Sequence, residues 1–278
     1  MLMFDGIDVD IEGLTDRGRV RRENQDQFLI AALHKAIEVH GTSIPESYRQ
    51  RFNSGAKALL LLVADGVGGR IGGDEAASIT LDAITDYVTN SMRCFYKLDE
   101  QIPQELLSEL AATVARSHDS VLQRAEERPE HAGMATTLTM AHVLWPRAYV
   151  VQIGDSRCYH VRGSTIAQVT KDQTLVQELV DLGALSPEDA RGSPLSNILS
   201  QAIGGGEELQ PAISKIAMEP GDALVLCTDG LTGHVSDAEI LAHFQAAESS
   251  QNACQRLVQA ALDDGGRDNV TVIVGRFR

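Results

Sequence analysis

Two apolar segments of this sequence lead to the same dipeptide, and this repeated pattern constrains the fold more than any other feature. Residues Ala58–Ala64 (ALLLLVA) precede Asp65-Gly66, and Ala223–Thr228 (ALVLCT) precede Asp229-Gly230. A segment that is apolar at nearly every position predicts a strand buried on both faces. Each strand therefore carries a carboxylate out of the apolar interior at its end, beside a glycine that adds no side chain.

Three more aspartates lie at the edges of strand-like segments. Asp155 follows Ala148–Ile153, whereas Asp26 and Asp268 each stand just before an apolar segment. If these edges meet, like charges gather where solvation is poor, and they must take up protons or bind cations. All-oxygen ligands favour Mg²⁺ or Mn²⁺, and the carbonyl of Gly66 can serve as another ligand. The alternative for any single Asp-Gly pair is an ordinary turn.

Composition excludes several classes of protein. The formal net charge is −15, whereas a protein that binds a nucleic-acid backbone needs a basic face, so we expect no nucleic-acid partner. No segment approaches the ~20 apolar residues that cross a bilayer, and the first residues do not form a signal peptide, so we expect no membrane association. The four cysteines form no Cys-x-x-Cys pair, which is typical of a reducing compartment. We therefore expect a cytoplasmic protein.

The order of the predicted elements indicates an α+β fold. Strands come in blocks and helices in pairs, without βαβ alternation, which favours layers of antiparallel sheet covered by helices. No linker divides the chain, so we expect a single domain over residues 1–278. The predicted strands are Gly6–Leu14, Gln27–Leu33, Lys57–Ala64, several short strands within 135–170, Ile213–Met218, Ala223–Thr228 and the segment after Asn269; the predicted helices are Glu75–Asn90, Gln104–Glu127, a punctuated stretch over Gln173–Gly206, Asp237–Ala247 and Asn252–Leu262.

Arg21 stands close to the first of the aspartates, in Arg21-Arg22-Glu23-Asn24. A guanidinium beside a dianionic phosphate makes bidentate, charge-assisted contacts that lysine does not reproduce. The alternative is a solvated charge pair in a loop. The eight histidines show no metal-ligand spacing and are interpreted as surface or core residues.

Six motifs follow one another in an order that resembles the PP2C (PPM) family of metal-dependent Ser/Thr protein phosphatases, bacterial type. The resemblance covers nearly the whole chain, and the ordered set is specific where a single motif would be weak. The motifs are Arg21-x-x-Asn24-x-Asp26, Val63-Ala64-Asp65-Gly66-Val67-Gly68-Gly69, Gly133-Met134-Ala135-Thr136-Thr137, Gly154-Asp155-Ser156-Arg157, Cys227-Thr228-Asp229-Gly230-Leu231 and Arg267-Asp268-Asn269-Val270-Thr271.

The resemblance implies a four-layer αββα sandwich of two antiparallel sheets flanked by helices, with two Mg²⁺ or Mn²⁺ ions at one edge and a third, weaker ion beside them. Carried over by position, it also implies the site residues. Asp65 would bridge both metals, the Gly66 carbonyl would bind one of them, and Asp229 and Asp268 would bind the other. Asp26 would support the cluster through water, and Asp155 with Asp229 would hold the third ion. Arg21 would bind the phosphate, Asn269 would orient its loop or serve as a turn residue, and Thr136 and Thr137 would pack beneath the metal site.

The implied reaction is hydrolysis of phosphoserine or phosphothreonine by direct attack of a metal-bridging water, without a phosphoenzyme. The implied partners are phosphorylated proteins and a cognate Ser/Thr kinase, in signal transduction. The sequence departs from the family pattern at three positions. Val67 replaces a histidine proposed as general acid, so that leaving-group protonation falls to a metal-bound water. Gln25 replaces a glutamate, and Gln173 replaces a histidine at the start of the flap, about residues 171–206.

Three other interpretations remain at this point. A catalytically silent member of the same family would bind phosphoproteins without turnover, although none of the metal aspartates is missing. Asp8-Val9-Asp10 resembles the Asp-x-Asp nucleophile of haloacid-dehalogenase-type enzymes, but it lies near the N-terminus and not after a buried strand. The glycines within Asp65–Gly73 miss the G-x-G-x-x-G spacing of nucleotide-binding loops because Ile71 occupies the third place.

Overall fold

Strand β4 (Asn53–Ala64) shows how the apolar segments build the core. In the computed structural model, which describes residues 2–4, 6–36, 53–67, 72–91, 103–190, 193, 195–206 and 208–278, Leu59 and Leu61 pack into one apolar cluster. Leu60 and Leu62 pack into a second cluster on the opposite face of the strand. Because successive side chains of a strand point to opposite faces, β4 must lie between two other layers, as its unbroken apolar sequence predicts.

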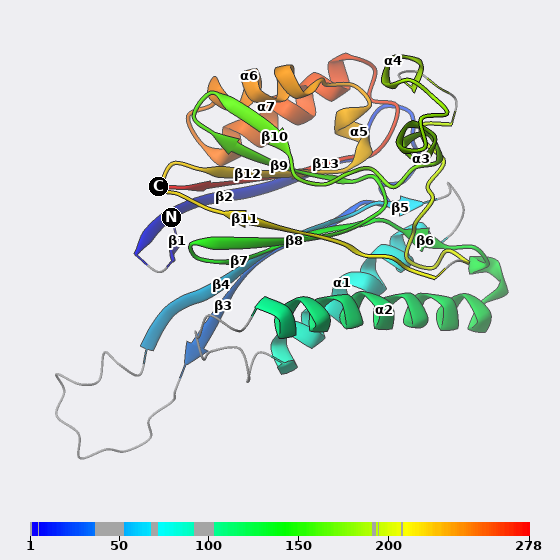
Figure 1. Ribbon diagram of the computed structural model, residues 1–278, viewed down its shortest axis with the longest axis horizontal. Helices are drawn as coiled ribbons and strands as arrows, with labels where there is room; N and C mark the ends of the chain where they lie inside the picture. The colour runs from blue at the N-terminus through cyan, green and yellow to red at the C-terminus, as the bar shows by residue number, and fades with distance from the viewer. Residues whose placement is uncertain are drawn as a thin grey trace.

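Two sheets stacked face to face form the centre of the molecule (Figure 1). The cluster between them includes Leu61 of β4, Leu226 and Ile273. The strands of the first sheet, in order, are β10 (Thr165–Gln168), β9 (Arg157–Arg162), β12 (Ala223–Cys227), β13 (Val270–Phe277) and β2 (Ile7–Asp16). Those of the second are β3 (Gln27–Ala36), β4, β7 (Leu138–Leu144), β8 (Arg147–Ile153) and β11 (Ala212–Ala217).

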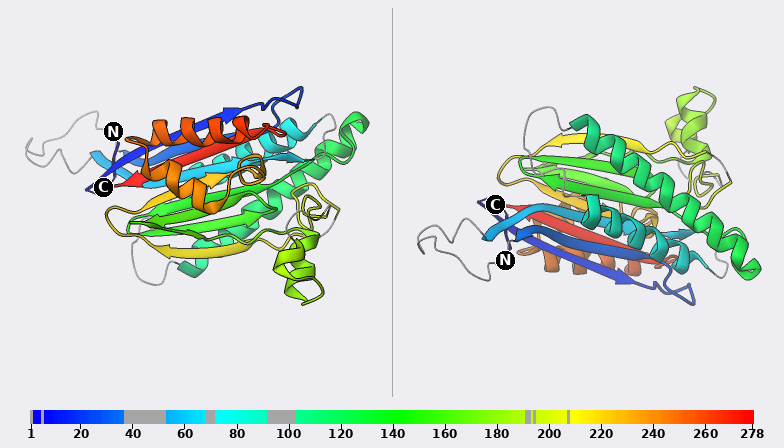
Figure 2. Two further views of the ribbon diagram at one scale, coloured as in Figure 1. Left: turned by 90° about the horizontal axis from the view of Figure 1, so that it is seen from above. Right: turned by 90° about the horizontal axis from the view of Figure 1, so that it is seen from below.

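Helices cover the outer face of each sheet, which completes the predicted αββα order of layers (Figure 2). The outer cluster of the first sheet includes Val225 and Val272 packed with Leu257, and that of the second includes Leu60 with Ile84 and Val114. The helices on the first sheet are α6 (Asp237–Gln245) and α7 (Ser250–Asp263), and those on the second are α1 (Gly73–Ser91) and α2 (Pro103–Glu127). Among the described residues, no helix has the length and apolar character needed to cross a membrane.

Several details differ from the sequence-based expectation. The two sheets are joined at one corner by β1 (Leu2–Phe4), which pairs antiparallel with β2 and, through Phe4 and Ala56, parallel with β4. The stretch 173–206 is mostly turns, because only α3 (Leu175–Asp181) and the single turn α4 (Pro187–Ala190) are α-helical. Strand β6 (Ala135–Thr136) falls within the predicted run of short strands over 135–170. The elements β5 (Gly66–Val67), α5 (Asp229–Thr232) and the 3₁₀ turn η2 (Pro129–His131) were not predicted, because they are too short to show a period.

The strand registers bring the acidic strand ends together at one edge of the sandwich. Antiparallel pairing of Gln27 with Ala64 places the residue before β3 beside the residue after β4. Pairing of Cys227 with Val272 likewise places the end of β12 beside the start of β13. Antiparallel strands thus align the start of one with the end of its neighbour, which the chain uses twice to gather carboxylates. Gly68 and Gly69 of the second motif lie outside the described residues.

Candidate metal centre

A pocket of about 580 Å³ opens at the edge of the sandwich where these strands end. Most of the predicted site residues line it. They are Arg21, Asp65, Gly66, Asp155, Asp229, Asp268 and Asn269. Asp26 does not line the pocket but lies buried beneath it, with a relative exposure of 3%. The fold therefore brings together residues that are up to 248 positions apart in the sequence.

Asp26 is held by two threonines that follow it by more than 200 residues. Its Oδ2 accepts hydrogen bonds from Thr271 Oγ1 at 2.7 Å and from Thr228 Oγ1 at 2.9 Å, whereas its Oδ1 is buried without a hydrogen-bond donor. Burial raises the pKa of Asp26 to about 7, although the two hydroxyl donors oppose this rise. A buried carboxylate with one oxygen satisfied and the other free is poised to accept a proton or face a cation.

Asp65 and Asp229 interact directly across the pocket. Burial is the largest cause of the raised pKa of Asp65, followed by the charges of Asp26, Asp229 and Asp155. The pKa of Asp229 is also raised, first by burial and then by Asp268. Each of these two carboxyl groups affects the pKa of the other, so Asp65 and Asp229 titrate together. Carboxyl groups buried together in this way either take up protons or bind a cation.

The backbone around Asp65 is fixed by the two threonines of the third motif. Thr137 Oγ1 accepts from the Asp65 amide at 3.1 Å, while Thr136 Oγ1 and the Thr137 amide donate to the Asp65 carbonyl at 2.8 and 2.9 Å. Gly66 then pairs with Thr136 in the β5–β6 ladder. A Cβ at Gly66 would lie 2.5 Å from the carbonyl carbon of Gly73, so only glycine lets the start of α1 approach this closely.

Asp155 belongs to a loop that buried polar side chains hold from below. Gln152 Nε2 donates to the carbonyls of Gly154 and Ser156, and the Gly154 amide donates to Gln173 Oε1 at 2.7 Å. Burial is the main reason that the pKa of Asp155 is raised well above its usual range, and the charge of Asp229 adds to it. Gln173, which stands where the family usually has histidine, is thus a support of the Asp155 loop.

Asp268 and Asn269 connect the last motif to the loop that carries Arg21. Asp268 accepts from Arg21 Nε at 2.7 Å and from Arg21 Nη2 at 2.5 Å, a bidentate contact. The buried Asn269 side chain accepts from the Gln25 amide at 2.9 Å and donates to the carbonyls of Arg17 and Glu23. These three bonds explain why asparagine follows the aspartate, because its amide group both donates and accepts.

These residues suit divalent cations chemically. Buried Oδ1 atoms of Asp26 and Asp229 lack donors, and burial disfavours the charge of four carboxyl groups at once; a cation relieves both conditions. In the described part of the chain, no three His, Cys, Asp or Glu side chains are already arranged as the ligands of one ion, and Asp268 is directed to Arg21. The donor set therefore fits Mg²⁺ or Mn²⁺, while the coordination shell is not preformed.

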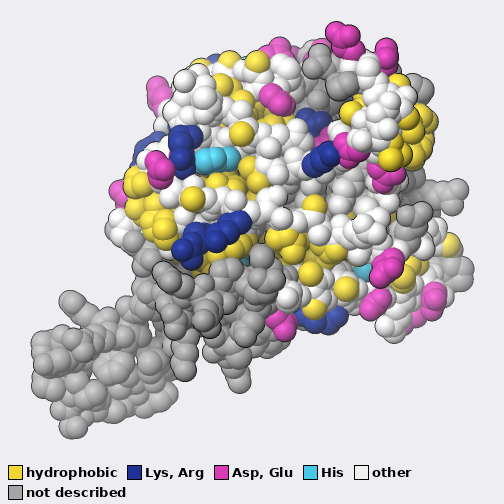
Figure 3. Space-filling view, viewed as in Figure 1, with side chains coloured by type: hydrophobic (Ala, Val, Ile, Leu, Met, Phe, Trp, Pro, Cys, Tyr) yellow, Lys and Arg dark blue, Asp and Glu magenta, His cyan; other side chains and the backbone are white. Residues whose placement is uncertain are grey.

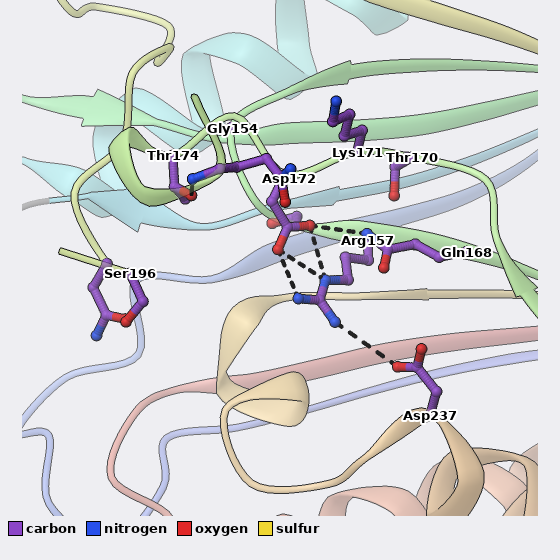
Figure 4. Close-up of polar contacts among 12 residues, drawn as sticks. Gly154, Arg157, Gln168, Thr170, Lys171, Asp172, Thr174, Ser196 and Asp237 are labelled. Atoms are coloured by element: carbon purple, nitrogen blue, oxygen red, sulfur yellow. Dashed lines mark hydrogen bonds and ion pairs between the residues drawn. The ribbon is translucent and has the colours of Figure 1, made fainter. Parts of the chain in front are cut away.

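The segment predicted to be a flap is anchored beside the pocket. Figure 4 shows the guanidinium of Arg157 facing the carboxylate of Asp172, with Nε–Oδ1 and Nη2–Oδ2 distances of 2.8 and 2.6 Å, and a further nitrogen directed at Asp237. A groove of about 770 Å³ runs from Asp155, Asp229 and Asp268 to flap residues such as Ser193 and Asn197. The segment predicted to be a flap therefore forms one side of this groove.

The outer surface of the flap is unusually apolar. Leu175, Leu182 and Ile198 are 37%, 80% and 46% exposed. Figure 3 shows hydrophobic side chains gathered at the corner of the molecule where α3 and α4 lie. Exposed apolar groups in one place are typical of surfaces that contact other macromolecules.

Sequence reasoning gave no role to some residues that support the site. Thr228 and Thr271 belong to two of the motifs, and no role is predicted for them, although a hydroxyl residue at an otherwise apolar strand end indicates a buried polar partner. The Asp8-Val9-Asp10 motif lies on β2, where Asp10 Oδ2 accepts from the Ser250 amide at the start of α7. None of its residues lines the pocket.

Comparison with known proteins identifies the family. A sequence model described as "Protein phosphatase 2C" matches residues 48–265. The chain is 38% identical to the serine/threonine protein phosphatase PstP of Mycobacterium tuberculosis over 79% of its own length and 40% of the relative, so it spans about two fifths of that protein. It is 31% identical to protein phosphatase PhpP of Streptococcus pneumoniae, over 95% of this chain and 96% of the relative.

A solved structure agrees with the sequence relatives. The catalytic domain of serine threonine protein phosphatase PstP in complex with 2 manganese ions superimposes with a TM-score of 0.74 at 31% identity, covering 98% of each chain. The predicted resemblance and the predicted sandwich are both confirmed by these matches. On the strength of the family-wide sequence match and this shared fold, the chain belongs to the protein phosphatase 2C family.

Proposed function

We propose that this protein is a metal-dependent phosphatase that hydrolyses phosphoserine and phosphothreonine in proteins. The observation that carries the proposal is the gathering of four carboxyl groups with raised pKa values around one pocket, beside an arginine able to bind phosphate. The relatives named as Ser/Thr phosphatases, and the manganese ions of the related catalytic domain, support it. Two Mg²⁺ or Mn²⁺ ions, with a third weaker one, are the proposed cofactors.

The proposed roles follow from the contacts of each residue. Asp65, Asp229 and Asp268, with the Gly66 carbonyl, would hold the two main ions; Asp155 with Asp229 would hold the third; and Asp26 supports them from below. Bound divalent ions lower the pKa of water and neutralise charge on the phosphoryl group. Because the pKa values of Asp65 and Asp229 are raised, protons compete with metal ions for these two carboxyl groups.

Arg21 is the proposed phosphate ligand. Its guanidinium is bidentate to Asp268 here, and the planar fork that fits this carboxylate also fits two phosphoryl oxygens. In the described lining of the pocket there is no histidine, and the position of the family's proposed acid is Val67. We propose that water supplies the proton to the leaving serine or threonine oxygen.

Proposed partners are phosphorylated proteins and a Ser/Thr kinase whose action this enzyme opposes, in signal transduction. We also propose a cytoplasmic location, which is supported by the described cysteines, since Cys158, Cys227 and Cys254 are all buried free thiols. A catalytically silent binding module is disfavoured because every aspartate of the proposed metal site is present at the pocket or beneath it.

The deciding experiment is hydrolysis of a phosphothreonine peptide by the purified protein with Mn²⁺ and with EDTA. We expect Mn²⁺-dependent phosphate release, and we expect Asp229→Asn to abolish it with little change in thermal unfolding. Phosphate release that persists in EDTA, or an Asp229→Asn variant as active as wild type, would overturn the assignment. If the wild type binds Mn²⁺ and the phosphopeptide without turnover, the silent-module alternative is correct.

A further inference from the structure

His234 is a buried histidine next to the proposed metal site that no motif includes. It follows α5, the turn that begins with Asp229, and its side chain is 3% exposed. Its ring lines the same groove as Asp229 and Asp268. A polar ring buried at this position needs partners, and it finds them in the loop that leads to Asp268.

Both ring nitrogens of His234 are used by that loop. Nε2 accepts a hydrogen bond from the backbone amide of Arg267 at 3.1 Å, and Nδ1 lies 2.8 Å from Asp264 Oδ2. Because Nε2 accepts, the ring proton of the neutral side chain resides on Nδ1, which therefore donates to Asp264. The Arg267 side chain adds a 3.4 Å contact from Nη2 to the Gly233 carbonyl, the residue before His234.

These bonds join two separate pieces of backbone that each carry a proposed metal ligand. Asp229 starts α5, and Asp268 follows Arg267 directly. The other side of the 264–268 loop is held by the Arg19 amide, which donates to the Gly266 carbonyl at 2.8 Å. Asp229 and Asp268 repel one another, as the effect of Asp268 on the pKa of Asp229 shows, and these contacts oppose their separation beyond what the pairing of β12 with β13 provides.

We infer that His234 is a positioning residue that sets the spacing of Asp229 and Asp268 for a shared divalent ion, by accepting the Arg267 amide and anchoring on Asp264. The inference rests on the metal site of the proposed function and adds a residue outside the family motifs. Partners that orient ligands from outside the coordination shell contribute to metal affinity, typically by 10–100-fold. His234 acts through backbone, so it touches neither metal nor substrate.

The test compares two substitutions of His234, each of which retains one of the two hydrogen bonds that the ring makes. Gln places an oxygen near the Nε2 position and retains an acceptor for the Arg267 amide, whereas Asn reaches only as far as Nδ1 and retains a donor for Asp264. Mn²⁺ affinity is measured on the full chain from the electron paramagnetic resonance signal of free Mn²⁺, without turnover. We expect His234→Asn to weaken Mn²⁺ binding about tenfold and His234→Gln to stay near wild type.

A matched control is a second histidine–aspartate pair, formed by His160 of β9 and Asp222 just before β12. His160 Nε2 lies 2.9 Å from Asp222 Oδ2, at the opposite end of β12 from Asp229. His160→Asn should lower the unfolding temperature in EDTA and leave Mn²⁺ affinity unchanged. Should His234→Asn not fold, Asp264→Ala replaces it, because Asp264 is 61% exposed and its loss frees the ring without opening the core.

The outcomes separate this inference from a merely structural role. Weaker Mn²⁺ binding by His234→Asn, or by Asp264→Ala in its place, with rescue by His234→Gln, supports it. Wild-type Mn²⁺ affinity in the Asn or Asp264→Ala variant overturns it, as does equal weakening by Asn and Gln or by the His160→Asn control. If wild type binds Mn²⁺ but hydrolyses no phosphopeptide, the proposed function fails while the affinity comparison still decides the role of His234.

Discussion

Replacing Asp26 with asparagine should stabilise the metal-free protein at pH 8 and weaken its binding of Mn²⁺. The carboxylate is buried, and its Oδ1 has no hydrogen-bond donor, so the folded protein must keep a charge in an unfavourable place when Asp26 ionises. Asparagine has the same shape and no charge. Its side-chain oxygen can still accept from Thr228 and Thr271, as Oδ2 of Asp26 does.

The magnitude follows from the pKa of Asp26. Burial raises this pKa to about 7, against roughly 3.9 for an unfolded aspartate. Three pH units at 1.36 kcal/mol each give an upper limit of about 4 kcal/mol of destabilisation in the ionised folded state. Part of the raised pKa of Asp26 comes from the charges of neighbouring carboxyl groups, and burying the asparagine NH₂ has a cost of its own, so the gain in stability is smaller than this limit. We therefore expect Asp26→Asn to raise the free energy of unfolding by about 1–3 kcal/mol at pH 8.

The sign of the pH dependence provides a sharper check. A carboxyl group with a raised pKa binds its proton more tightly in the folded state, so the metal-free wild type should gain stability as the pH falls from 8 towards 5. Asp26→Asn has no proton to gain at this position. The excess of its free energy of unfolding over that of wild type should therefore shrink at pH 5 to about a third of its value at pH 8. Mn²⁺ should weaken or reverse the trend in the wild type, because protons compete with the metal for the same oxygens.

Asp222 is the matched control for this prediction. It is equally buried, with 1% relative exposure, but Arg162 and His160 bond to its carboxylate and lower its pKa. Ionised Asp222 stabilises the folded protein at pH values above the usual pKa of an unfolded aspartate. This stabilisation is lost as the pH falls through the lowered pKa that Asp222 has in the folded state. Asp222→Asn should therefore destabilise the protein at pH 8, opposite in sign to Asp26→Asn.

The assay is urea unfolding followed by circular dichroism in EDTA at pH 8 and pH 5, for wild type and both variants. Mn²⁺ binding by the same proteins is measured separately by titration. The reasoning is refuted if Asp26→Asn is no more stable than wild type at pH 8, or if its effect is the same at both pH values. It is also refuted if the variant binds Mn²⁺ as tightly as wild type.

Three further substitutions test other parts of the site. A Cβ at Gly230 would lie 1.8 Å from the Asn269 carbonyl oxygen, so Gly230→Ala should separate the two loops and lower both the unfolding temperature and Mn²⁺ affinity; unchanged Mn²⁺ affinity would contradict this. Thr271→Val removes a donor to Asp26, so the acidic limb of Mn²⁺-dependent hydrolysis should move to higher pH by about one unit, and a fixed limb would count against it. Arg21→Lys should raise the KM for a phosphopeptide about tenfold and change kcat less, in steady-state assays; an unaltered KM would exclude Arg21 as the phosphate ligand.

Much of the fold could be read from local patterns in the sequence. The apolar segment before Asp65 predicted a doubly buried strand, and β4 packs both of its faces into separate clusters. Helices with a 3.6-residue period, such as α1 and α2, were also found near their true bounds. The stretch 173–206 was predicted as helical and is mostly turns, because its short helix signals cannot outweigh the glycines, prolines and serines between them.

By itself the sequence determined which residues could form the site, because an aspartate at the end of a buried strand is visible from its neighbours alone. Tertiary structure alone decided which oxygen of Asp26 is free, that burial raises the pKa of Asp65 and Asp229 together, and that His234 bonds to the loop before Asp268. Such partners are up to 245 residues apart, as with Asp26 and Thr271. Burial leaves a periodic trace in the local sequence, whereas a hydrogen bond between distant segments depends on strand register and loop packing, which no local pattern records.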